Sequence, residues 1–146
     1  MENITIRKLK VEDIESVVEV HRSITQNPDI EDFQIALKEM AGLESSACFV
    51  ADANGRIIGY MVSYILSGSF GIQPSAWITM VGVHPEYMGK GIGKELATTV
   101  FGYYKSKKIN RVMTSVRWYD ADLLSFFRTL GFDRSEFIPL QKPLDE

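Results

Sequence analysis

The most constraining feature of this chain is a glycine-rich segment that follows a run of apolar, β-branched residues. The run stops at His84-Pro85, and Gly89, Gly91 and Gly93 then occupy alternate positions at the start of a stretch with helical periodicity. Glycine lets the backbone approach a ligand closely, and the free N–H groups at a helix start attract anions. The segment therefore predicts a strand, a turn and a helix start that binds a phosphate or pyrophosphate.

Two common phosphate-binding motifs fit this segment poorly. A Walker A loop needs a glycine where Met88 stands and a Ser or Thr after Lys94, where Glu95 follows. A dinucleotide-binding fingerprint has the spacing Gly-x-Gly-x-x-Gly at the start of a βαβ unit, whereas these glycines alternate and a hairpin lies upstream. The first motif is excluded and the second is weakly supported.

Length and composition define the general class of protein. The 146 residues suit one domain, residues 1–146. A composition of 45% hydrophobic and 24% charged residues is typical of a globular protein.

The net charge of −3 argues against a nucleic-acid partner. No run approaches the roughly 20 apolar residues of a membrane span. The N-terminus lacks the apolar core of a signal peptide. Cys48 is the single cysteine, so no disulfide within the chain is expected. The two histidines are far apart in the sequence, so no metal site is expected either. We expect a cytoplasmic protein with no membrane or nucleic-acid partner.

Hydrophobic periodicity indicates the order of the elements. Two helical patterns follow a short N-terminal strand, and Asn54-Gly55 between two strand-like runs is typical of a tight hairpin. The hairpin strands are expected at 47–51 and 57–66, further strands at 76–83, 111–116 and 132–140, and further helices from Ile92 and across 123–130. The order β-α-α-β-β-β-α-β-α-β predicts an α/β fold, a mixed sheet with helices on both faces.

Two motifs, in this order, resemble those of the GNAT superfamily of N-acetyltransferases. The acyl-CoA motif of that superfamily is Arg/Gln-x-x-Gly-x-Gly/Ala after a strand ending in Val-x-Pro. It is similar to Val83-His84-Pro85 followed by Met88-Gly89-Lys90-Gly91-Ile92-Gly93. The downstream motif, Asn-x-x-Ala-x-x-Phe-Tyr-x-x-x-Gly-Phe, is similar to residues 120–132. The resemblance covers almost the whole chain. It implies the GNAT-like acyl-CoA N-acyltransferase fold and acetyl transfer from acetyl-CoA to an amine of a small molecule or peptide.

The resemblance also implies how acetyl-CoA is held. Backbone N–H groups of the glycine segment would bind the pyrophosphate, and the preceding strand would bind the pantetheine arm. The residues implied to bind the cofactor are Val81, Gly82, Val83, Gly89, Lys90, Gly91, Ile92, Gly93, Lys94, Asp120 and Phe127. The thioester would lie in a gap between this strand and the strand expected over 111–116.

The chain departs from the superfamily at three informative positions. Met88 stands where Arg or Gln is usual, which implies weaker cofactor affinity, and Asp120 replaces an Asn without loss of helix-capping ability. Phe127 replaces the frequent Tyr that protonates the leaving thiolate, so another group or water must serve. Tyr119 and Asp122 are close in the sequence and are the candidate catalytic acids.

No carboxylate occupies the strand over residues 76–80, where many relatives carry a Glu that acts as the base. An amine with a pKa of about 10.4 is neutral in only about 1 in 2,500 molecules at pH 7, which costs roughly 4.6 kcal/mol without help. An α-amine, with a pKa near about 7.7–8.0, needs less assistance. The missing base favours a weakly basic amine or a proton relayed by water.

Two classes of function remain open from the sequence. One is the acetyltransferase, with an acceptor that enters over the first two helices and the loop 67–74. The other is a non-catalytic acyl-CoA-binding sensor or regulatory module. An exposed strand edge expected near residues 137–140 also makes a homodimer possible.

Overall fold

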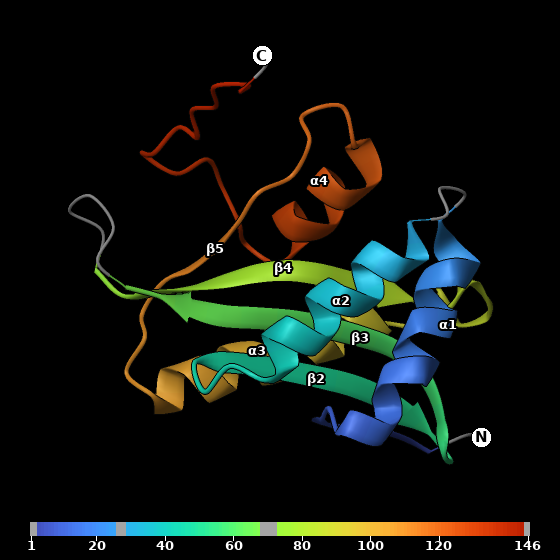
Figure 1. The fold of residues 1–146 in the computed structure, drawn as a ribbon. Coiled ribbons are helices and arrows are strands. Elements are labelled where there is room, and N and C mark those ends of the chain that lie inside the picture. The colour runs from blue at the N-terminus through green and yellow to red at the C-terminus, as the bar shows by residue number, and fades with distance from the viewer. Residues whose placement is uncertain (1–2, 26–28, 68–72, 145–146) are drawn as a thin grey trace. The chain divides into compact units, whose positions relative to one another are not determined.

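The computed structural model describes residues 3–25, 29–67 and 73–144 (Figure 1). The elements fall in two compact units, Met1–Ser115 and Val116–Glu146. Unit 1 contains β1 (Ile4–Lys8), η1 (Val11–Asp13), α1 (Ile14–Ile24), α2 (Ile30–Ala41), β2 (Ser46–Ala53), β3 (Arg56–Leu66), β4 (Ser75–Val83), η2 (Pro85–Tyr87), α3 (Ile92–Ser106) and β5 (Val112–Thr114). Unit 2 contains α4 (Ala121–Thr129).

Unit 1 is built on a five-stranded sheet in the order β1-β2-β3-β4-β5. The first four strands are antiparallel and β5 runs parallel to β4, so the sheet is mixed as predicted. Asn54 and Gly55 join β2 to β3 with φ of 52° and 94°, the positive values that favour these two residues in a tight hairpin turn. The predicted hairpin and the α/β fold class are confirmed.

Helices cover both faces of this sheet, with α1 and α2 on one face and α3 on the other (Figure 1). The core beneath α1 and α2 includes Val17, Val18, Leu37, Tyr60 and Val62, all buried. On the opposite face the Ser63 hydroxyl donates to a backbone carbonyl and lies 2.7 Å from Tyr104 Oη of α3. Burial raises the pKa of Tyr104 to about 12, so this hydroxyl keeps its proton and donates to Ser63. Side chains of β3 thus tie both helical layers to one strand.

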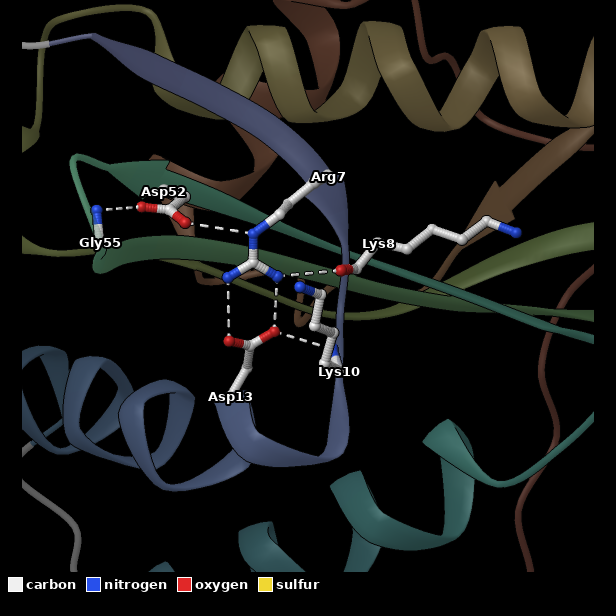
Figure 2. Close-up of polar contacts among 6 residues, drawn as sticks. All are labelled: Arg7, Lys8, Lys10, Asp13, Asp52 and Gly55. Atoms are coloured by element: carbon white, nitrogen blue, oxygen red, sulfur yellow. Dashed lines mark hydrogen bonds and ion pairs between the residues drawn. The ribbon is translucent and has the colours of Figure 1, made fainter.

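A charged cluster fastens the edge strand β1 to the sheet and to the chain that follows it (Figure 2). Arg7 donates to both carboxylate oxygens of Asp13, at 2.7 and 3.0 Å, and its Nε donates to Asp52 on β2 at 3.1 Å. Asp13 also accepts the Lys10 N–H at 2.7 Å, and Asp52 accepts the Gly55 N–H at 2.6 Å. The Arg7 guanidinium lowers the pKa of Asp13 below its ordinary value. One arginine therefore links β1, η1 and the β2–β3 hairpin.

The prediction of a last strand over residues 132–140 is wrong. The structure assigns no strand to this segment, which is fully described. The Phe137 N–H bonds to the Ser135 side chain in a local turn at 3.1 Å, and Ile138 is 81% exposed. Pro139 has no N–H to donate to a neighbouring strand. A homodimer argued from a strand edge in this segment loses that basis.

We predict that Asp13→Asn lowers the free energy of unfolding by about 2 kcal/mol at pH 7, because the Arg7 guanidinium loses its charged partner. The folded-state pKa of Asp13 lies below its unfolded value, so this stabilisation is complete above the ordinary carboxyl pKa. It is lost as the pH falls through the folded-state pKa, and the gap between wild type and variant then narrows.

Urea unfolding at neutral and acidic pH measures both effects. The matched control is Glu19→Gln, which breaks an exposed ion pair to Arg22 (2.9 Å) and is expected to cost less than about 0.5 kcal/mol. An Asp13→Asn deficit that stays constant down to acidic pH contradicts the prediction.

Candidate functional site

Strands β4 and β5 pair over only three residues and then part. The pairs are Ala76–Val112, Trp77–Met113 and Ile78–Thr114, and the Thr114 hydroxyl closes the series by donating to the Ile78 carbonyl at 2.9 Å. Beyond Ile78 this edge of β4 has no strand partner in the described part of the chain, while the other edge stays paired with β3 as far as Val83. The end of β4, including Val81, Gly82 and Val83, therefore presents backbone N–H and C=O groups at an open edge.

Gly82 is required by the side chains packed against it. A Cβ at this position would lie 2.6 Å from Ile24 Cδ1 and 2.7 Å from Tyr60 Oη. His21 holds Tyr60 in place, with Nδ1 3.2 Å from Tyr60 Oη and its ring stacked 3.7 Å from that of Phe33. Burial lowers the pKa of His21 and raises that of Tyr60, so Tyr60 donates to a neutral imidazole. His21 is therefore a satisfied core histidine that helps to fix the end of β4.

The chain passes from β4 into α3 through two glycines with positive φ. Gly89 has φ of 80° and Gly91 has φ of 79°, and a Cβ at either position would meet nothing within 4 Å. Conformation, and not lack of space, requires glycine here. The Glu95 N–H bonds back to the Gly91 carbonyl at 3.0 Å, so the N–H groups of residues 92–94 precede the first intrahelical bond. Together with the helix dipole they form a site suited to an anion.

Cationic side chains lie over an aromatic ring beside this turn. Lys90 Nζ lies 5.1 Å from the centroid of the buried Tyr87 ring, which restricts the lysine stem beside the glycine turn. Met88 is 56% exposed and brings no charge or hydrogen-bond donor. Arg56 lies over the same Tyr87 ring, with Cζ 5.9 Å from its centroid. Positive charge near this turn therefore comes from Lys90, from Arg56 and from Lys94 in the first turn of α3, and position 88 contributes none.

Unit 2 carries the two candidate acids at the start of α4. Asp120 Oδ1 accepts the Leu123 N–H at 3.1 Å, so Asp120 caps the helix, and Asp122 is exposed in the first turn. Tyr119 is 62% exposed, and its Oη accepts a hydrogen bond from Arg117 at 2.6 Å. A phenol that accepts in this way still has its own proton to donate. The acid roles of Tyr119 and Asp122 stay predictions.

Phe127 packs among aromatic side chains of the same unit. Its ring centroid lies 5.2 Å from that of Phe126 and 5.0 Å from that of Phe132, both with edge-on geometry. These contacts hold the C-terminal half of α4 against the residues that follow it. Phe127 has no proton to give, and its contact with a cofactor stays a prediction.

Strand β4 contains an irregularity that the sequence did not predict. The register passes from Val62–Met80 to Ser63–Ile78, so Thr79 is an extra residue and forms a β-bulge. No glycine or proline marks this position, and no local signal would have revealed it. Most of the loop expected to contact the acceptor, residues 67–74, lies outside the described residues.

The described ranges contain neither a membrane-spanning helix nor a metal-binding cluster. No helix there is long and apolar enough to cross a membrane. Over the same residues, no group of three or more His, Cys, Asp and Glu side chains is placed to hold a metal ion.

The parted strands, the glycine turn and the free helix start match the features that the sequence motifs imply. The sequence fits the profile of the acetyltransferase (GNAT) family over residues 14–132, and the chain belongs to this family. The family uses acetyl-CoA as co-substrate.

The individual relatives have low sequence identity to this chain. Mycothiol acetyltransferase of Saccharomonospora viridis is 27% identical over 134 residues, which are 86% of this chain and 44% of that protein. The chain thus spans less than half the length of this relative. The aminoglycoside N-acetyltransferase AAC(6')-Iy in complex with CoA has a TM-score of 0.80 at 19% identity, with 98% of this chain and 96% of that chain covered. The aminoglycoside acetyltransferase meta-AAC0020 from an uncultured soil metagenomic sample, in complex with sisomicin, has a TM-score of 0.72 at 22% identity, with 97% of each chain covered. At these identities the structural likeness shows the fold.

We predict that Gly91→Ala weakens acetyl-CoA binding about tenfold, because an L side chain disfavours the positive φ by roughly 1–2 kcal/mol and the turn shifts. Calorimetric titration with acetyl-CoA measures the affinity. Gly102→Ala is the matched control, since Gly102 lies within α3 and a Cβ there meets nothing within 4 Å. The control is expected to keep the affinity and to gain up to about 1 kcal/mol of stability. Unchanged affinity in Gly91→Ala contradicts an ordered glycine turn at the cofactor site.

Proposed function

We propose that this protein is an N-acetyltransferase that moves an acetyl group directly from acetyl-CoA to a primary amine. The observation that carries this proposal is the joining, within unit 1, of an open β4 edge to a free helix start through the Gly89–Gly91 turn. An extended arm with a pyrophosphate at one end suits such a site, since the edge offers backbone groups and the helix start offers N–H donors. Membership of the acetyltransferase family supports the same conclusion.

The proposed division of roles follows the chain. The N–H groups of Gly89, Lys90, Gly91, Ile92, Gly93 and Lys94 bind the pyrophosphate, and the edge at Val81, Gly82 and Val83 binds the pantetheine arm. The thioester then lies where β4 leaves β5. Backbone N–H groups polarise its carbonyl, and positioning of the two reactants supplies much of the rate enhancement.

The reaction exchanges one bond for another. The amine lone pair forms the C–N bond as the C–S bond breaks, and the nitrogen loses a proton to water or to a base. The leaving thiolate takes a proton from Tyr119, Asp122 or water, and a thiol pKa near about 8.5 makes this last step undemanding. Because β4 carries no carboxylate, the step that needs most help is deprotonation of the amine, and a weakly basic acceptor needs least.

The acceptor class is a small polar amine. Structural neighbours include aminoglycoside acetyltransferases, one of them in complex with sisomicin, and the curated relatives are mycothiol acetyltransferases. Their names favour a small-molecule acceptor over a peptide. The cytoplasmic location and the homodimer stay predictions.

Titration followed by turnover tests this function. We expect calorimetry to show binding of acetyl-CoA and no comparable binding of NAD or ATP. Thiol release is then measured with sisomicin, spermidine and an amino acid amide as acceptors, each against the spontaneous rate. Failure to bind acetyl-CoA would refute both the proposed cofactor and the proposed function.

The second candidate is a non-catalytic acyl-CoA-binding module, favoured by the absence of a carboxylate on β4 and by Phe127 in place of a proton donor. Acetyl-CoA binding without thiol release for any amine supports it. Turnover above the spontaneous rate with a single amine is enough to exclude it.

We predict that Met88→Arg tightens acetyl-CoA binding about threefold at low ionic strength, because an exposed arginine beside the glycine turn adds a charge for the phosphates. The gain is expected to shrink in high salt, which screens exposed charges. Calorimetry at two salt concentrations measures it, with Met88→Leu as the neutral control. Equal affinities of the Arg and Leu variants at low salt would place the phosphates elsewhere.

A further inference from the structure

The direction of one backbone hydrogen bond shows which groups at the end of β4 face its open edge. The His84 N–H donates to the Ile58 carbonyl of β3 at 2.7 Å. Backbone groups alternate in direction along a strand, so the N–H and C=O of Gly82 also point to β3. Those of Val81 and Val83 then point to the edge that has no strand partner among the described residues. Gly82 is therefore the residue through which β3 holds the two outward-facing N–H groups.

The ring of Tyr60 takes the place of a side chain at Gly82. Tyr60 is the cross-strand partner of this glycine, and a Cβ on Gly82 would lie 2.7 Å from Tyr60 Oη and 2.8 Å from Cε1. Ile24, at the end of α1, closes the same space, with Cδ1 2.6 Å from that position. Because glycine has no side chain of its own to pack, the position of this part of β4 depends on how firmly the phenol is held.

The phenol is held by the two helices that cover this face of the sheet. Tyr60 is 1% exposed, and its hydroxyl donates to Nδ1 of His21 on α1 at 3.2 Å. The His21 ring stacks on Phe33 of α2, with centroids 3.7 Å apart and planes inclined by 3°. Phe33 also meets the Tyr60 ring edge-on at 5.8 Å. The three rings therefore form a closed set, in which His21 supplies the hydrogen-bond acceptor.

Loss of that acceptor would affect the reaction through the backbone of β4. A buried hydroxyl without a partner is destabilising, so the phenol would move to find another one. Its movement would release Gly82 and displace the N–H groups on either side, which polarise the thioester carbonyl in the proposed function. A displacement on the order of 1 Å at a reacting centre can cost about a hundredfold in rate. Binding of the pyrophosphate would change less, because its N–H donors belong to the glycine turn and α3.

We propose that His21 is a positioning residue for acetyl transfer: its hydrogen bond to Tyr60 keeps the phenol against Gly82 and so holds the thioester-binding end of β4 in place. This inference rests on the proposed function and adds to it a residue that touches neither acetyl-CoA nor the amine. It also gives α1 and α2 a task beyond the acceptor side, since they set the geometry of the strand that binds the acyl donor.

Two substitutions of His21 separate its hydrogen bond from its ring. His21→Phe keeps the stacking on Phe33 and removes the acceptor. His21→Asn removes the ring, but its Oδ1 can take the place of Nδ1, since both atoms are bonded to Cγ. We expect kcat for thiol release to fall about tenfold in His21→Phe and less than about threefold in His21→Asn. The Kd of acetyl-CoA, measured by calorimetry, is expected to change less than about threefold in both variants.

A role in packing alone predicts the reverse order of the two variants, because loss of the ring would then be the larger defect. A His21→Asn protein as slow as His21→Phe, or slower, overturns the proposal. Wild-type kcat in His21→Phe overturns it as well.

The matched control removes a buried phenol from the other face of the sheet. Tyr104 of α3 is also 1% exposed, and its Oη lies 2.7 Å from Ser63 Oγ. We expect Tyr60→Phe to lower kcat about as much as His21→Phe does, and Tyr104→Phe to leave kcat within about twofold of wild type. The double variant His21→Phe/Tyr60→Phe is expected to be no slower than the slower single variant, because both substitutions break one hydrogen bond. Losses that multiply in the double variant contradict the proposal.

A spectroscopic measurement separates this inference from the proposed function. If the wild type binds acetyl-CoA and releases no thiol, the backbone amide resonances of isotope-labelled protein still report the position of β4. We expect the resonances of Val81, Gly82 and Val83 to shift in His21→Phe and to return toward their wild-type positions in His21→Asn. They are expected to stay in place in Tyr104→Phe. Wild-type positions in His21→Phe overturn the inference, whether or not the protein turns over.

Discussion

Among the described residues, the end of β4 pairs with another strand along one edge only, and the proposed site depends on this arrangement. Pairing with β5 stops at Ile78, so β3 alone keeps the last residues of the strand in register. Packing replaces the missing strand: the Tyr60 hydroxyl and Ile24 fit against Gly82, where no side chain has room. The helices that cover this face therefore do more than bury apolar surface. They hold in place a strand whose other edge is left open.

The site relies on backbone groups more than on side chains. Backbone N–H groups at a strand edge and a helix start are positioned by hydrogen bonding and by two positive φ angles, and they survive many substitutions. A cofactor site of this kind tolerates the departure of Met88 and Asp120 from the family pattern. The chemical step has no comparable support, since Phe127 cannot donate a proton and β4 has no carboxylate. We therefore expect the rate of the chemical step to depend more on the positioning of the two reactants and on the basicity of the amine.

Local signals in the sequence were sufficient for part of this structure. The Asn54-Gly55 hairpin, the turn from β4 into α3 and the helix stripes depend on backbone conformation or on periodicity within a few residues, and they were predicted correctly. The strand expected over 132–140 failed because a strand needs a partner, and no nearby sequence reports whether one exists. The bulge at Thr79 is likewise a property of two strands together, and no local signal marks it. The hairpin and the glycine turn were therefore readable from the sequence, whereas the bulge depends on the register of two strands.

The two edges of the sheet have opposite consequences for the protein without its ligand. At the β1 edge, Arg7 is engaged by Asp13 and Asp52 and the exposed Lys8 adds charge, a combination that discourages pairing with another chain. At the β4 edge the backbone beyond Ile78 has no strand partner among the described residues, and in the proposed function the cofactor arm would lie along it as an added strand. In that arrangement acetyl-CoA would protect this edge from pairing as well as supply the acetyl group. Without the cofactor this edge would be free to pair with an extended segment of another chain, so we expect self-association by strand addition to increase as acetyl-CoA is depleted.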